Sequence, residues 1–266
     1  MNIKDILGLE DEKPLGRLIA DSGFFGIFKT VGCIGDSLSA GEFESLNEEN
    51  IVGFHDYYEY SWASYMTNMT GAKLLNFSRG GMTAEEFFGT YAAKVGAFKM
   101  ENRCQCYILA LGVNDINQGK ELGNIDEIDV SKRKDPSDQT FAGYYAEIIR
   151  RLKAIQPEAK FFLITMPQGE DDEQKKRLKD QHAEILHTLA EKFKNTYVLD
   201  FRKYAPVYDY EFRENFFMSG HMNPMGYILT GKMVMSYIDY IIRHNMKDFK
   251  EVGFIGTPYK NISVKS

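Results

Sequence analysis

Five short apolar runs, separated by segments with helical periodicity, limit the folds that this chain can adopt. The runs are rich in Val, Ile, Leu and Phe, and most of them do not alternate with polar residues. Runs of this length and composition are typical of strands buried on both faces of a parallel sheet. We therefore predict strands at residues 29–34, 73–77, 106–111, 160–166 and 196–201.

The segments between these runs carry helix signals. Thr83-Ala84-Glu85-Glu86 is a capping box, which predicts a helix toward residue 100. Apolar side chains at three-to-four spacing predict a helix from Phe141 to just before Pro157, and further helices are predicted at 172–194 and from Pro224 to about 244. Strands that alternate with helices imply right-handed βαβ units. We therefore predict an α/β protein, a three-layer α/β/α sandwich around a five-stranded parallel sheet.

Length and composition narrow the class of protein further. The 266 residues contain no internal repeat or low-complexity linker, so a single domain over 1–266 is expected. The formal net charge of −6 and the lack of a basic run argue against nucleic acid or an anionic membrane as a partner. The first residues lack the apolar region of a signal peptide, which predicts a cytoplasmic protein unless a leader was removed. Cys33, Cys104 and Cys106 complete neither a disulfide framework nor a zinc site.

Polar motifs follow four of the predicted strands. Ser37, in Gly35-Asp36-Ser37-Leu38-Ser39, follows the first strand, and Gly81, Asn114 and His221 follow the second, third and fifth. In parallel sheets, ligands bind beyond the carboxyl ends of the strands, so we expect these residues to converge. A serine needs a neighbouring base and donors for the oxyanion. Here Ser37 would attack an acyl carbon and His221 would carry its proton.

These motifs resemble the four blocks of the SGNH, or GDSL-type, hydrolase family. Gly35-Asp36-Ser37-Leu38-Ser39 resembles the nucleophile block, Gly81 the second-block glycine, Gly112-Val113-Asn114-Asp115 the third block, and His221 the last-block histidine. The resemblance covers about residues 28–245. It implies a flavodoxin-like fold and a serine esterase or acylhydrolase that forms an acyl-enzyme at Ser37. The N–H groups of Ser37 and Gly81 and the Asn114 side chain would form the oxyanion hole. No metal or cofactor would be required.

One position departs from the family pattern. The family usually carries an acid three residues before its histidine, and Met218 stands there in this chain. Three explanations are open. His221 works as a dyad base oriented by a backbone carbonyl; or a carboxylate from elsewhere, such as Asp209, Glu211 or Glu214, reaches its Nδ1; or the protein is catalytically impaired.

Two functions from different classes therefore compete. One is an esterase that cleaves a small-molecule ester, with a small or carbohydrate-borne acyl group preferred. The alternative is a binding protein for a carbohydrate or acylated ligand. The aromatic stretch 201–217 is expected either to pack in the core or to line the site, and the polar segment 115–139 either to cover the site or to form a surface excursion. The terminal segments either cap the sheet or contact a second subunit in a homo-oligomer.

Overall fold

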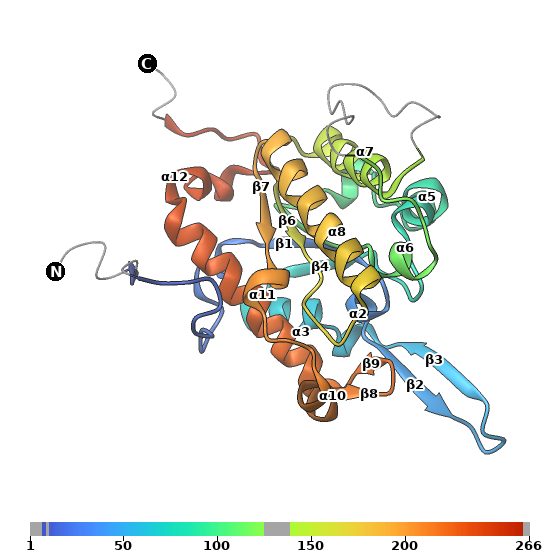
Figure 1. Ribbon diagram of the computed structural model, residues 1–266. Coiled ribbons are helices and arrows are strands. Elements are labelled where there is room, and N and C mark those ends of the chain that lie inside the picture. The colour runs from blue at the N-terminus through green and yellow to red at the C-terminus, as the bar shows by residue number, and fades with distance from the viewer. Residues whose placement is uncertain (1–6, 9–10, 125–138, 263–266) are drawn as a thin grey trace.

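The computed structural model describes residues 7–8, 11–124 and 139–262 (Figure 1). Within these residues, a five-stranded parallel sheet has the order β4-β1-β5-β6-β7. The strands are β4 (Lys73–Asn76), β1 (Thr30–Gly35), β5 (Cys106–Ala110), β6 (Lys160–Ile164) and β7 (Thr196–Leu199). The predicted α/β class and all five predicted strands are confirmed.

Helices cover both faces of this sheet, as the prediction required (Figure 1). One face packs against α4 (Ala84–Glu86), α5 (Ala92–Val95), α7 (Phe141–Ile155) and α8 (Glu173–Lys192). The other face packs against α3 (Trp62–Thr70), α11 (Pro224–His244) and α12 (Met246–Phe249). Shorter helices are α2 (Ser37–Ala40), α6 (Val113–Asn117), α9 (Phe201–Tyr204) and α10 (Tyr210–Phe216).

The central strands explain why the apolar runs do not alternate. In β5, Tyr107 and Leu109 belong to the core on one face, whereas Cys106 and Ile108 belong to the core on the other. Both sets are fully buried, so every position of the strand favours an apolar side chain. The three cysteines are free and buried, and Cys33 and Cys106 belong to the apolar core.

Side-chain caps account for the helix boundaries. Thr140, Asp172 and Asn223 cap the N-termini of α7, α8 and α11. Thr83 likewise accepts a hydrogen bond from the Glu86 N–H, but the helix that it opens is shorter than predicted. After α4 the chain makes a π-helical turn, continues as α5, and ends at Gly96, whose φ of 69° stops the helix.

Two antiparallel hairpins have no counterpart in the sequence-based prediction. The larger one, β2 (Glu42–Leu46) with β3 (Val52–Asp56), projects from the end of the sheet where Ser37 lies (Figure 1). The smaller one pairs β8 (Phe217–Met218) with β9 (His221–Met222). Both contain polar or charged residues and are short, so neither produces an apolar run. Gly41 starts the larger hairpin with a φ of 74°, and a Cβ there would lie 2.4 Å from the Tyr57 carbonyl oxygen.

The N-terminal segment packs on α11. The Arg243 guanidinium binds the Leu7 carbonyl oxygen at 2.8 Å, and it also pairs with the carboxylates of Glu12 and Asp239. Residues 125–138 lie outside the described residues, and they make up most of the polar segment 115–139 that was expected either to cover the site or to form a surface excursion. No helix among the described residues is long and apolar enough to cross a membrane.

Replacing Phe162 with alanine tests the assignment of the core. The Phe162 ring is fully buried in β6 and packs against Phe28, Tyr197 and Phe249. Truncation should lower the free energy of unfolding by about 3–5 kcal/mol, because a cavity replaces a large apolar side chain. Urea unfolding followed by circular dichroism measures this change. Phe254→Ala, at a ring that is 39% exposed, is the matched control and should cost much less; equal losses would contradict the assignment.

Candidate active site

Ser37 stands at the tight turn between β1 and α2. Asp36 caps this short helix by accepting a hydrogen bond from the Leu38 N–H at 3.1 Å, which leaves Ser37 as its first residue. A Cβ at Gly35 would lie 2.2 Å from Ser39 Oγ, so only glycine fits at the end of β1. The Ser37 residue is 9% exposed. The turn thus presents the serine at the carboxyl end of a central strand, as predicted.

The turns after β4 and β5 are bound to one another beside this serine. The Asn114 amide donates to the Met82 carbonyl oxygen at 3.2 Å. The Asp115 carboxylate accepts from the Ala84 N–H at 3.1 and 3.2 Å, so it also caps α4. Gly81 has a φ of 71°, and nothing lies within 4 Å of the position that a Cβ would take. The Gly81 backbone therefore borders open space. The hydrogen bond to Met82 holds the Asn114 side chain next to the loop that contains Gly81.

His182 supports the loop that carries Asn114. Its Nε2 donates to the Leu111 carbonyl oxygen at 3.0 Å, and a Cβ at Gly112 would lie 2.5 Å from the same nitrogen. Burial lowers the pKa of His182 to about 4, so this imidazole is neutral at pH 7. No motif around His182 in the sequence indicates this role. Because a side chain at position 112 would collide with His182, the loop Gly112-Val113-Asn114-Asp115 packs directly against this histidine.

His221 lies on β9, which packs against both α2 and β2. Its Nδ1 is 2.6 Å from Oε1 of Glu44, a residue of β2. Met218 is 44% exposed and supplies no acid, and Asp209 caps α10 instead by accepting from the Phe212 N–H. A carboxylate from elsewhere therefore does reach Nδ1, but the three residues named from the sequence were the wrong ones. No local sequence pattern around Glu44 or around His221 indicates that the two hairpins are in contact.

A second carboxylate lies at the other nitrogen of the same imidazole. Glu42 Oε1 is 3.0 Å from His221 Nε2. Burial raises the pKa of Glu42, and the nearby His221 opposes this shift. A Cβ at Gly80, the residue before Gly81, would lie 2.0 Å from Glu42 Oε2, so the absence of a side chain there makes room for Glu42. In this conformation Nε2 thus faces Glu42, five residues beyond Ser37 in the chain.

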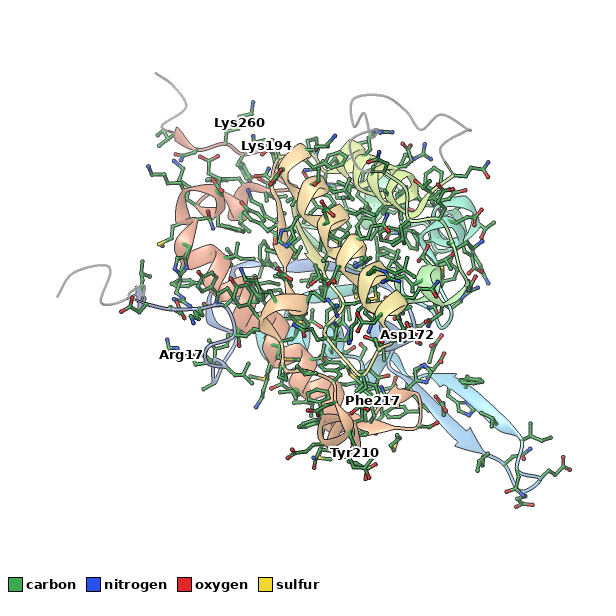
Figure 2. The ribbon with its side chains drawn as sticks, viewed as in Figure 1. Arg17, Asp172, Lys194, Tyr210, Phe217 and Lys260 are labelled. Atoms are coloured by element: carbon green, nitrogen blue, oxygen red, sulfur yellow. The ribbon has the colours of Figure 1, made fainter. Side chains whose placement is uncertain are left out.

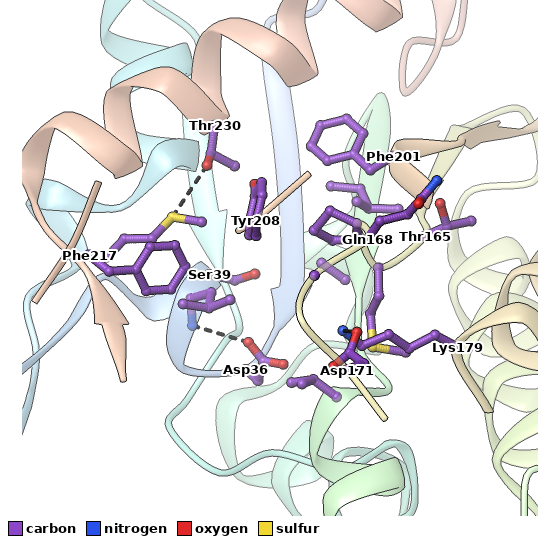
Figure 3. A pocket seen from close by; sticks show the side chains of 18 of the residues that line it. Asp36, Ser39, Thr165, Gln168, Asp171, Lys179, Phe201, Tyr208, Phe217 and Thr230 are labelled. Atoms are coloured by element: carbon purple, nitrogen blue, oxygen red, sulfur yellow. Dashed lines mark hydrogen bonds and ion pairs between the residues drawn. The ribbon is translucent and has the colours of Figure 1, made fainter. Parts of the chain in front are cut away.

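A pocket of about 460 Å³ opens beside the serine turn, beyond the carboxyl ends of β1, β5 and β6 (Figure 3). Phe217 and Asp172 mark this end of the molecule in Figure 2, opposite Lys194 and Lys260. Asp36, Leu38 and Ser39 contribute the wall next to Ser37. The remaining wall combines aromatic and polar side chains, including Trp62, Thr165, Gln168, Asp171, Lys179, Phe201, Tyr208, Phe217 and Thr230. Three rings of the stretch 201–217 therefore line this pocket.

Comparison with known families agrees with this arrangement. Residues 33–229 match the GDSL-like Lipase/Acylhydrolase family, and this range contains all four motifs. The chain belongs to this family. The predicted family resemblance is thereby confirmed. Membership in this family supports a general function as an acylhydrolase.

Solved structures share the fold of this GDSL-like protein at low identity. A protein from Lactobacillus plantarum is 17% identical, with a TM-score of 0.58, over 80% of this chain and 97% of the other. A carbohydrate esterase family 2 enzyme from Corynascus thermopiles is 14% identical, with a TM-score of 0.53, over 86% and 69%. An acetyl xylan esterase is 18% identical, with a TM-score of 0.51, over 79% and 99%. The comparison with curated proteins gave no match.

The buried Asp36 carboxyl should make stability depend on pH. Burial raises the pKa of Asp36 to about 7. The unfolded chain releases this proton near pH 4, whereas the folded chain keeps it until about pH 7, so stability should fall as pH rises through this window, by on the order of 2–4 kcal/mol. Asp36→Asn keeps an oxygen for the Leu38 N–H and should flatten the dependence.

Urea unfolding at several pH values between 4 and 8 measures this slope. Asp21→Asn is the matched control, because Asp21 also accepts a backbone N–H, that of Gly23, but at the surface. The same slope in wild type and Asp36→Asn would contradict the expectation.

Proposed function

We propose that this protein is a serine esterase that cleaves a carboxylic ester through an acyl-enzyme at Ser37. The supporting observation is that neighbours of Ser37, Asn114 and His221 line one pocket, namely Asp36, Leu38, Val113 and Gly220. The Asn114 amide is in turn bonded to the loop that carries Gly81. Each element matches a step of acyl transfer: a nucleophile, a base and oxyanion donors. Family membership supports the general class of hydrolase.

In the proposed reaction, Ser37 Oγ attacks the ester carbonyl while His221 Nε2 takes the hydroxyl proton. The N–H groups of Ser37 and Gly81 and the Asn114 amide donate to the developing oxyanion. His221 then protonates the departing alkoxide, and water attacks the acyl-enzyme by the reverse path. For the first step, Nε2 has to exchange its 3.0 Å contact with Glu42 for one with the Ser37 hydroxyl.

Ser37→Ala should abolish hydrolysis of p-nitrophenyl acetate, lowering kcat by at least about 10³-fold, because no acyl-enzyme can form. A fluorophosphonate probe should label the wild type and leave Ser37→Ala unlabelled. Ser64→Ala, at an exposed hydroxyl on α3, is the control and should keep both properties. Failure of the wild type to label would instead favour the alternative function, a binding protein on this fold.

For the substrate, we propose a small acyl group, with an acetylated carbohydrate as its preferred carrier. The pocket supports this class, because aromatic rings such as Tyr208 and Phe217 can stack on a sugar while the polar side chains of Gln168 and Asp171 can meet its hydroxyls.

Initial rates on acetyl, butyryl, octanoyl and decanoyl p-nitrophenyl esters, and on fully acetylated xylose, test this preference. We expect kcat/KM to be highest for acetyl esters and to fall beyond butyryl. A maximum at octanoyl or longer would show that the pocket accepts an extended acyl chain, contrary to the proposal.

A further inference from the structure

We propose that Glu44, on the β2–β3 hairpin, is the acidic positioning residue of this active site and replaces the acid that is missing at Met218. Glu44 would hold the proton on His221 Nδ1 and leave Nε2 free to take the proton of Ser37. This inference rests on the proposed esterase function, and it adds a third member that comes from a different part of the chain.

Three donors converge on the Glu44 carboxylate. Its Oε1 accepts from His221 Nδ1 at 2.6 Å and from the Gly220 N–H at 3.0 Å. Hydrogen bonds from the Ser219 hydroxyl and from His221 lower the pKa of Glu44, so it is ionised at neutral pH. An ionised carboxylate can only accept, and therefore the proton of this bond belongs to Nδ1. In an imidazole that carries this one proton, the lone pair is on Nε2, as a base for Ser37 requires.

The β8–β9 turn is shaped to admit this carboxylate. A Cβ at Gly220 would lie 2.6 Å from Glu44 Oε1, so any larger residue would displace the acid. The preceding residue, Ser219, holds a φ of 57°, a conformation that costs energy for a residue with a side chain. Both features lie between Met218 and His221, within the segment that would carry the family's acid. Here the same segment binds an acid that another hairpin supplies.

The larger hairpin carries Glu44 to the histidine directly from the nucleophile turn. Glu44 is seven residues after Ser37, and β2 packs against β9. Across the hairpin Glu44 pairs with Phe54, whose ring meets the His221 ring edge-on at 6.2 Å between centroids. One strand pair thus presents a carboxylate to Nδ1 and an aromatic ring to the same imidazole. This arrangement restricts the rotation of His221.

The two glutamates of β2 are suited to different roles. Glu42 contacts Nε2, the nitrogen that must become available to Ser37, and burial raises its pKa. Glu44 contacts Nδ1, and its hydrogen bonds lower its pKa. Two neighbouring carboxyl groups whose pKa values shift in opposite directions are typical of a divided function in active sites. Glu44 is therefore the member that can stay bound to His221 throughout the reaction.

Substitution of Glu44 tests this role. Glu44→Ala should lower kcat for p-nitrophenyl acetate by about 10²–10⁴-fold with KM within about threefold, because the acid affects the base and not the pocket. Glu44→Gln keeps the shape and removes the charge, and it should give a smaller loss. Glu211→Gln, at a carboxylate on the nearby α10, is the matched control and should keep wild-type kcat.

Two further measurements separate the role of Glu44 from other effects. A second variant checks against folding defects, and an NMR signal reports on His221 without any reaction. Gly220→Ala retains every charged group but displaces Glu44, so it should lower kcat as Glu44→Gln does. Proton NMR of the wild type should show a downfield Nδ1–H signal of His221, retained in Glu211→Gln and lost in Glu44→Ala. Thermal unfolding confirms that each variant is folded.

The outcomes separate this inference from the proposed function. If wild type hydrolyses esters but Glu44→Ala and Gly220→Ala keep kcat within about threefold, the role of Glu44 is wrong and the esterase stands. If the NMR signal depends on Glu44 but wild type neither hydrolyses esters nor labels with fluorophosphonate, the contact exists and the esterase proposal is wrong. Persistence of the NMR signal in Glu44→Ala would also overturn the inference.

Discussion

Burial of the central sheet on both faces is the constraint on which the remaining structure depends. Apolar side chains fill both faces of β1, β5 and β6, so these strands can present polar groups only beyond their ends. In a parallel sheet those ends lie along one edge, and the turns after β1, β4 and β5 become neighbours there although they are far apart in the sequence. The pocket and the candidate active site both follow from this edge.

The turns at this edge are held by groups that have no part in the proposed chemistry. Asp115 ties the turn after β5 to the first N–H of α4, and His182 supports the same turn from beneath Gly112. Burial raises the pKa of Asp115 to about 6, and its bonds to the Ala84 N–H oppose the shift. Such buried contacts restrict the positions of Gly81 and Asn114. Oxyanion donors stabilise a transition state only when they are placed to within a fraction of an ångström, so this rigidity favours the proposed function.

The β2–β3 hairpin brings to this edge two carboxylates that the parallel sheet does not supply. It leaves the nucleophile turn at Gly41 and brings two carboxylates to the imidazole of His221. The family pattern has an acid close to its histidine in sequence, whereas here Glu44 and His221 are 177 residues apart. In the proposed active site, the acid would come from this hairpin, so the packing of β2 against β9 would set the orientation of the base.

The sequence by itself determined the α/β class, the five buried strands, the helices α7, α8 and α11, and the family, because these depend on local periodicity and on motifs that are contiguous in the chain. It also predicted which turns would meet, since parallel strands leave little choice. It did not predict the hairpins, whose strands are short and give no sustained apolar or alternating pattern, nor the partner of His221. Only the tertiary structure decided that Glu44 rather than Asp209, Glu211 or Glu214 reaches Nδ1. The identity of this partner depends on the packing of β2 against β9. These two segments are far apart in the chain, and neither local sequence indicates that they meet.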